Sequence, residues 1–342
     1  MGYRAEKEKI EKKLKILKRV LLGILLFVLL FVCIFSIFFP PSTWKYNVGL
    51  PKVGERKDGE MRLHFIDVGQ GDATLIELSD GKNMLIDGGD GSSASTKTLI
   101  RYLNALDIDE IDYLVVSHAD TDHCGGLKAV IEQFNVFNAY LPPSFSSDNV
   151  KYAEFYAALL KTDCEITYSS RALANIGTSK EDKENGYTLS FLSPTSVTVE
   201  DILSGNEKVK DTNVLSSVIW LDYKGVSALF MGDAPYSVEE DLLRDYDLGA
   251  FDARGVDLSS TEILKVSHHG SSNATGANFL QRLHVKEGII SCGKGNAYGH
   301  PDVATLTRLI EANVNVHRTD MDGHVRITIS PNGEYTVKNI AS

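Results

Sequence analysis

The sequence predicts an α/β protein in which two packed β-sheets follow a single transmembrane helix. Residues 20–39 form an apolar run without a charged side chain. From Met61 onward, short apolar segments of strand length alternate with segments of helical period. The alternation passes through two successive halves, each opening with strands, which suggests two sheets packed together. With 342 residues, 43% of them hydrophobic and 24% charged, the chain can bury a substantial core.

The amino end is expected to anchor the chain in the cell membrane. A helix over residues 20–39 would be about 30 Å long, enough to span a bilayer. Residues 1–19 carry eight Lys or Arg and three Glu, so they are expected in the cytoplasm, with the rest of the chain outside. A cleaved signal peptide is the alternative, but the apolar run is long and ends in Phe-Phe-Pro-Pro without a small-x-small site. Cys33 has no small neighbour and is interpreted as a membrane-buried thiol, not a lipidation site.

After the anchor, residues 40–60 contain Pro, Gly and mixed charge without an apolar period, which indicates a linker. We treat residues 61–338 as one domain. Residues 169–186 and 200–211 are polar and are expected to be surface loops. The expected strands are residues 63–68, 73–78, 83–86, 111–117, 137–141, 188–192, 214–223, 226–231, 262–267 and 288–291. The expected helices are residues 95–106, 125–134, 150–161 and 276–284, with two more that begin at Pro235 and Pro301.

Charge and cysteine content exclude some classes of protein. The net charge of −11, with +5 on residues 1–19 and none on residues 20–39, leaves −16 on residues 40–342. Such a surface offers no broad basic track for DNA or RNA, although a metal site can still bind one phosphate. The exported part holds Cys124, Cys164 and Cys292, an odd number at wide spacing, so no disulfide framework is implied. Cys124 could be a thiolate ligand or nucleophile, but a buried packing role is favoured.

Four metal-ligand side chains crowd six positions directly after the expected strand 111–117. They are His118, Asp120, Asp122 and His123. Mixed imidazole and carboxylate ligands suit Zn²⁺, Mn²⁺ or Fe²⁺. A solvated charged loop is the alternative, but open α/β sheets place their sites at strand ends. The pattern therefore predicts a metal site.

Other expected strands also end on residues of this kind. Gly232-Asp233 closes one strand, and the Asp233 carboxylate has two oxygens that could bridge two cations. The adjacent imidazoles of His268 and His269 close another, and a strand would point them in opposite directions unless the backbone turns. His300 precedes the helix expected from Pro301, a position suited to proton donation or phosphate contact. Each of these signals is weak alone, because turns and core histidines are common.

Six motifs in order resemble the metallo-β-lactamase superfamily, in the branch of the hydrolase domain of the competence DNA-uptake protein ComEC. The match covers roughly residues 61–330, and it implies a four-layer αββα sandwich with a two-metal site along one edge. The motifs are Asp67-Val68-Gly69-Gln70-Gly71-Asp72-Ala73, Leu85-Ile86-Asp87-Gly88-Gly89, the loop 118–123, Gly232-Asp233, His268-His269-Gly270-Ser271 and Gly299-His300-Pro301.

The resemblance also implies roles for individual side chains. His118 and Asp120 would bind the first metal. Asp122 and His123 would bind the second, and Asp233 would bridge the two. The cofactors would be two divalent metal ions, Zn²⁺ or Mn²⁺.

The motifs depart from the commoner pattern of the superfamily at the first metal. Asp120 stands where many members have a second His, and no His lies between residues 123 and 268. Asn213 occupies the region where the missing His is expected, so it is predicted to face the metals or the substrate. Either His268 or His269 would complete the second site while the other contacts substrate, and His300 is expected to act in proton transfer. Asp72 and Asp87, in Gly-rich turns, are given supporting roles through hydrogen bonds.

The predicted function is that of a membrane-anchored extracytoplasmic phosphodiesterase. Two cations about 3.5 to 4 Å apart would activate a hydroxide for attack on phosphorus. The substrate is expected to be a phosphoester, either a small molecule or a cell-wall unit. Three alternatives stay open: a single-stranded DNA nuclease associated with DNA uptake, a non-catalytic metal-containing binding or scaffold protein, and, by superfamily name only, a β-lactam hydrolase.

Overall fold

The computed structural model describes residues 2–38, 41–144, 149–173, 176, 186–205 and 209–341. It divides into two compact units, Met1–Gly49 and Leu50–Ser342. The first unit contains helices α1 (Gly2–Phe38) and α2 (Pro41–Trp44). Within α1, Glu6–Ile37 is long and apolar enough to cross a membrane, which is compatible with the predicted anchor. A signal sequence would share these properties of length and composition.

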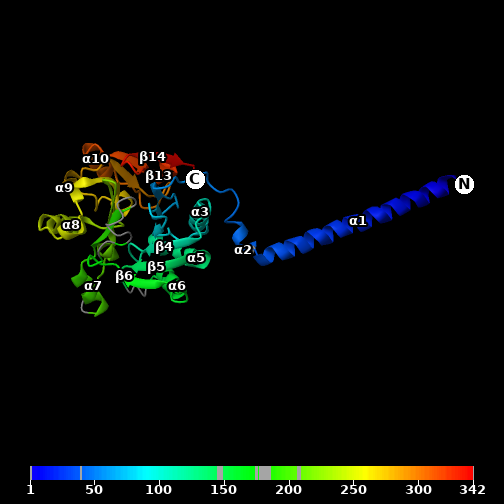
Figure 1. The fold of residues 1–342 in the computed structure, drawn as a ribbon, viewed down its shortest axis with the longest axis horizontal. Helices are drawn as coiled ribbons and strands as arrows, with labels where there is room; N and C mark the ends of the chain where they lie inside the picture. The colour runs from blue at the N-terminus through cyan, green and yellow to red at the C-terminus, as the bar shows by residue number, and fades with distance from the viewer. Residues whose placement is uncertain are drawn as a thin grey trace. The chain divides into compact units, whose positions relative to one another are not determined.

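The second unit contains two β-sheets that pack face to face (Figure 1). The first sheet has the strand order β14-β13-β1-β2-β3-β4-β5-β6, and the second has the order β12-β11-β10-β9-β8-β7. The strands of the first sheet are β1 (Met61–Phe65), β2 (Thr74–Glu77), β3 (Asn83–Ile86), β4 (Glu110–Val115), β5 (Asn135–Leu141), β6 (Glu165–Tyr168), β13 (His324–Ile329) and β14 (Tyr335–Ile340). The strands of the second are β7 (Tyr187–Ser193), β8 (Val218–Tyr223), β9 (Val226–Phe230), β10 (Thr261–Lys265), β11 (Glu287–Ile290) and β12 (Asn315–Arg318).

Helices cover the outer faces of both sheets, with α3, α5 and α6 near the first sheet and α8, α9 and α10 near the second (Figure 1). The helices are α3 (Ser93–Asn104), α4 (Thr121–Cys124), α5 (Leu127–Gln133), α6 (Val150–Leu159), α7 (Ser196–Leu203), α8 (Tyr236–Asp247), α9 (Ala277–Leu283), α10 (Val303–Glu311) and α11 (Thr319–Asp322). Short 3₁₀ turns cover Thr212–Leu215, Asp252–Arg254, Leu258–Ser260 and Ser267–Gly270. The two-sheet α/β fold predicted from the sequence is confirmed.

Side chains of alternate residues in β1 show how the layers are built. Met61, Leu63 and Phe65 point into the core between the sheets, where the Phe65 ring stacks on that of Phe230 at 6.2 Å. His64 belongs to the opposite set, which faces the helical layer, and its Nδ1 lies 3.0 Å from the hydroxyl of Tyr102 in α3. A strand with a period of two thus contributes to two layers at once.

The linker expected at residues 40–60 divides between the two units. Val53 is buried, and its carbonyl oxygen accepts a hydrogen bond from the Arg326 guanidinium. The guanidinium of Arg62 donates to the carbonyl oxygen of Gly54 at 3.0 Å. The compact unit therefore begins at Leu50 and not near Met61.

Several elements differ from the sequence-based expectations. The strand expected over residues 214–223 begins only at Val218, because the Asp211 side chain accepts a hydrogen bond from the Asn213 amide and starts a 3₁₀ turn. Helix α7 occupies residues 200–203 of an expected loop. Strands β6, β12 and β14 are short or half-exposed, so they lack the apolar run that identifies a buried strand. Most of the expected loop 169–186 lies outside the described residues.

A buried glutamate between α8 and α9 makes stability depend on pH. The Glu239 carboxylate accepts hydrogen bonds from the amides of Thr275 and Gly276, just before α9. Burial raises the pKa of Glu239 from 4.5 to about 7. The pKa of Glu239 is therefore higher in the folded than in the unfolded protein, so protonation of this carboxyl stabilises the fold. This contribution to the unfolding free energy is complete below pH 4.5 and is lost as the pH rises through 7.

We therefore expect wild type to lose roughly 2 to 3 kcal/mol of unfolding free energy relative to Glu239→Gln between pH 5 and pH 8. Denaturant unfolding of the metal-free protein at four pH values measures this difference. Glu311→Gln, at an exposed position on α10, is the control and should follow wild type at every pH. Parallel curves for wild type and Glu239→Gln would contradict the prediction.

Candidate metal centre

The loop that follows β4 brings three ligand-type side chains to one end of the sheets. His118 and His123 are fully buried, whereas Asp122 is a quarter exposed. Helix α4 starts within this loop, so the chain coils and returns His123 towards His118, with ring centroids 4.0 Å apart. The Asp87 carboxylate, at the end of β3, accepts hydrogen bonds from the Ser117 amide and hydroxyl and fixes the start of the loop.

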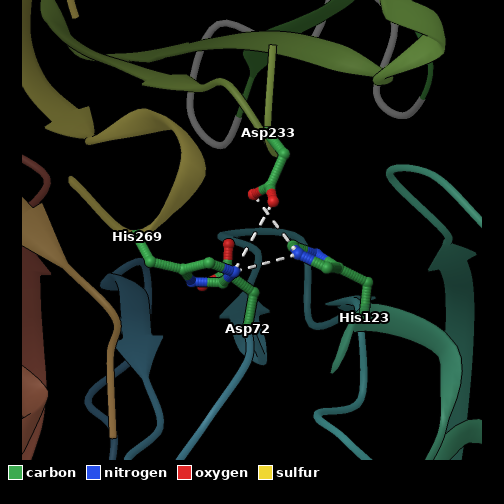
Figure 2. Close-up of side chains that lie close together, drawn as sticks. All are labelled: Asp72, His123, Asp233 and His269. Atoms are coloured by element: carbon green, nitrogen blue, oxygen red, sulfur yellow. Dashed lines mark hydrogen bonds and ion pairs between the residues drawn. The ribbon is translucent and has the colours of Figure 1, made fainter. Parts of the chain in front are cut away.

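Asp233 lies where strand β9 ends and faces four imidazoles. Its Oδ1 is 3.3 Å from Nε2 of His123. Its Oδ2 is 3.8 Å from Nε2 of His118, 3.7 Å from Nε2 of His268 and 3.6 Å from Nε2 of His269. We call these five side chains the Asp233 cluster. Figure 2 shows Asp233 approaching His123 and His269 from the strand β9 side of the site.

Each imidazole of the Asp233 cluster uses Nδ1 for another contact, which leaves Nε2 directed towards Asp233. Nδ1 of His123 lies 2.8 Å from the Asp87 carboxylate, and Nδ1 of His269 lies 2.9 Å from the carbonyl oxygen of Ser291. Nδ1 of His268 lies 3.0 Å from Oδ1 of Asn273, and Nδ1 of His118 lies 3.0 Å from the Ser117 hydroxyl. The carboxylate and carbonyl partners accept a hydrogen bond from Nδ1, so Nε2 is the nitrogen that can bind a metal.

The backbone turns sharply at His268 and His269, and this turn aims both rings at the site. Both residues have positive φ, 49° and 52°. Non-glycine residues adopt this conformation at a cost, and such strain concentrates at functional sites. His269 is buried, with its Nε2 3.3 Å from Oδ2 of Asp122. His268 stays 23% exposed, on the open side of the cluster.

Electrostatics in the cluster favour cations. Burial lowers the pKa of His118 to about 4, so its imidazole is neutral near pH 7. Burial would raise the pKa of the Asp122 carboxyl, but the hydrogen bond to His269 holds it below its usual range. For His269, burial alone would lower the pKa of the imidazole, but the negative charges of Asp233 and Asp72 raise it to about 10. The carboxylates are thus ionised, and a cation that binds Nε2 of His269 would take the place of a proton.

Unsatisfied buried atoms provide a second test of fit. Nε2 of His118 and Oδ1 of Asp233 are buried and make no hydrogen bond. An atom of this kind normally costs stability, and a metal ion would satisfy both. Ligand atoms of Asp72, His123, Asp233 and His269 lie within 4.8 Å of one another. The residues present therefore fit a divalent metal centre.

Comparison with known proteins identifies the family. The family model described as the metallo-beta-lactamase superfamily matches residues 66–294, more than half of the chain. The chain belongs to the metallo-β-lactamase superfamily.

Relatives of this metallo-β-lactamase domain agree with the predicted ComEC-type branch. The chain is similar to ComE operon protein 3 of Bacillus subtilis (strain 168), with 28% identity over 289 residues, 78% of this chain and 33% of that protein. It is also similar to competence protein ComA of Neisseria gonorrhoeae, with 27% identity over 276 residues, 81% of this chain and 33% of that protein. The chain thus spans about a third of the length of these relatives.

Among solved structures, the metallo-beta-lactamase fold protein YhfI from Bacillus subtilis matches with a TM-score of 0.46 and 11% identity. The match covers 81% of this chain and 99% of that one.

The metallo-β-lactamase fold brings together most of the side chains singled out in the sequence. Asp120, about half exposed, has Oδ2 3.7 Å from Nε2 of His118. The His300 ring lies at the rim, 5.7 Å from the His268 ring and parallel to that of Tyr298. Asn213 is half-buried in its 3₁₀ turn, and the contact from this turn to the metal loop comes from Thr212, whose hydroxyl donates to Asp120 at 2.7 Å. A direct role for Asn213 stays a prediction.

Sequence reasoning missed several contacts of the centre. The supporting role expected for Asp72 did not include its place in the buried group of potential metal ligands or its ion pair with Lys265. The Gln70 amide lies 3.4 Å from Asp122. A lysine at the end of an apolar strand, just before the His pair, could have indicated a buried ion pair at this position. Cys124 is buried, and burial raises the pKa of its thiol to about 12, which fits packing and not catalysis.

Proposed function

We propose that the chain is a membrane-anchored, metal-dependent phosphodiesterase whose catalytic domain acts outside the cytoplasm. The observation that carries the proposal is the Asp233 cluster, in which one buried carboxylate faces four Nε2 atoms from two separate loops. Two further observations support the proposal: the chain belongs to the metallo-β-lactamase superfamily, and it has a buried group of potential metal ligands.

The residues that would hold the metals follow from the contacts. Asp122, His123 and His269 would bind one cation, because their donor atoms meet beside Asp233. His118 and Asp120 would bind the other, on the exposed side of the same carboxylate. When bound, two divalent cations such as Zn²⁺ or Mn²⁺ lower the pKa of water and neutralise charge on a phosphoryl group.

The remaining side chains would handle the substrate. His268 reaches the open side of the cluster, and its Nδ1 contact with Asn273 holds the ring in place. His300 lies beyond it at the rim. Hydrogen bonds from these two imidazoles would orient a phosphoester and support the leaving oxygen. Position at the membrane would come from α1, with the basic residues before the span on the cytoplasmic side.

A second candidate is a nuclease acting on single-stranded DNA during uptake. The similarity to competence protein ComA favours it. The charge of −16 on residues 40–342, obtained from the total of −11 and the +5 of the amino end, favours a small phosphoester or a cell-wall unit instead. The chain has one candidate span among the described residues, so a DNA channel would need a partner protein.

A substrate panel tests the proposal. Purified full-length protein in detergent, loaded with Mn²⁺ or Zn²⁺, is offered a nitrophenyl phosphodiester, nitrophenyl phosphocholine, single-stranded DNA and a chromogenic β-lactam. We expect metal-dependent release of nitrophenolate. Preferential DNA cleavage that weakens steeply with salt would favour the nuclease. Metal binding without turnover of any substrate would instead indicate a binding or scaffold protein and would contradict the proposed activity.

A further inference from the structure

A buried ion pair joins the two sheets behind the metal centre. Nζ of Lys265, the last residue of β10, lies 2.7 Å from Oδ2 of Asp72, which belongs to the loop after β1. The two side chains are only 3% and 5% exposed. Nζ also donates to the carbonyl oxygen of Val266 at 3.1 Å. A lysine is rarely buried so completely, and then only with a partner.

The other oxygen of Asp72 faces a residue of the Asp233 cluster. Oδ1 lies 3.4 Å from Nδ1 of His269, whose N–H also points to the Ser291 carbonyl oxygen at 2.9 Å. The backbone of Asp72 is fixed as well, because its amide donates to the Asp122 carbonyl oxygen at 3.1 Å. Asp72 therefore touches the metal loop, the His269 ring and the opposite sheet.

Asp72 could instead be a direct metal ligand, since its carboxylate lies within 4.8 Å of the ligand atoms of His123, Asp233 and His269. The contacts argue against this. Oδ2 is held by Lys265, and Oδ1, which makes no hydrogen bond, faces Nδ1 of His269 at 3.4 Å, whereas Asp233 contacts Nε2 on the far edge of the same ring. Figure 2 shows Asp72 and Asp233 reaching the His269 ring from different sides.

We propose that Asp72 and Lys265 are positioning residues for His269. The Ser291 carbonyl oxygen accepts the hydrogen bond from Nδ1 of His269, and the negative charge of Asp72 beside Nδ1 favours the same ring orientation, which leaves Nε2 as the metal donor. A carboxylate in this place orients a ligating imidazole and strengthens it as a donor. The 2.7 Å ion pair with Lys265 holds the Asp72 carboxylate in place and out of the metal coordination, because an unpaired buried charge is unstable. The inference rests on the metal-binding part of the proposed function, not on the substrate.

Four full-length proteins test the inference: wild type, Asp72→Asn, Lys265→Met and the double variant. Metal affinity is measured with Mn²⁺ or Zn²⁺ against a chromophoric chelator, and stability by denaturation of the metal-free form. We expect Asp72→Asn to bind metal about tenfold or more weakly. The double variant should be more stable than Lys265→Met, because neither member of the ion pair is left charged. Its metal affinity should stay as low as that of Asp72→Asn. The absorption spectrum of bound Co²⁺ should shift in both variants that lack the carboxylate.

A matched control separates this role from general destabilisation. Glu77 on β2, like Asp72, is a buried carboxylate in an ion pair. Its partner is Arg62, at 3.7 Å. Glu77→Gln should lower stability without changing metal affinity or the Co²⁺ spectrum. Wild-type affinity and spectrum in the double variant would overturn the inference. Loss of one metal equivalent in Asp72→Asn would overturn it too, since Asp72 would then be a ligand. None of these measurements depends on turnover, so failure of the phosphodiesterase proposal would be distinguishable.

Discussion

Replacement of Asp233 by Asn is expected to abolish metal-dependent hydrolysis. The carboxylate contacts Nε2 of His118, His123, His268 and His269, and the amide has one oxygen where the carboxylate has two. One bridging ligand would be lost, and an NH₂ group would face the imidazole lone pairs. Because residues of one catalytic unit act together, turnover should fall on the order of 10³-fold or more. Steady-state hydrolysis of a nitrophenyl phosphodiester and metal content per chain measure the effect.

The protein should remain folded, because Asp233→Asn removes a buried charge and keeps the side-chain volume. Denaturant unfolding of the metal-free variant should therefore stay close to wild type. Asp252→Asn makes the same change at an exposed position and should leave turnover and metal content intact. Retained turnover in Asp233→Asn would rule out a bridging role and, with it, the two-metal mechanism.

The sequence predicted the metal-loop residues because their signal is local. His118, Asp120, Asp122 and His123 follow an apolar strand within six positions, and the structure places them at a strand end beside Asp233. Asp233 itself could be assigned only through the resemblance, since a Gly-Asp step alone is most often a turn. Convergence of strand ends in an α/β fold explains why such separate segments meet.

Other features depend on backbone geometry and on long-range packing, which the sequence does not reveal. The burial of His269 and the exposure of His268 follow from two successive residues with positive φ, a backbone turn that the sequence left open. The ion pair of Asp72 and Lys265 joins residues almost 200 positions apart, on different sheets. Residues 50–60 looked like a linker because their contacts are made by backbone carbonyl groups, which any sequence provides.

The substitution Gly71→Ala is expected to damage the metal centre from outside the ligand set. Gly71 has φ of +109°, and a Cβ there would lie 2.0 Å from the carbonyl oxygen of Asp122. The same oxygen accepts the hydrogen bond from the Asp72 amide. The metal loop would have to move away, which separates Asp122 from His269 and breaks that hydrogen bond. We expect a loss of roughly 3 kcal/mol or more in unfolding free energy, and metal binding at least tenfold weaker.

Gly69→Ala is the comparison that separates the steric clash with Asp122 from the strain of a positive φ. Gly69 belongs to the same loop and has φ of +77°, but no atom lies within 4 Å of the position of its Cβ. Its replacement should cost about 1 to 2 kcal/mol from the positive φ alone and leave metal affinity unchanged. Chelator competition and denaturant unfolding on both variants measure the two effects. Equal metal affinities in the two variants would show that the packing of Gly71 against Asp122 does not hold the metal loop in place.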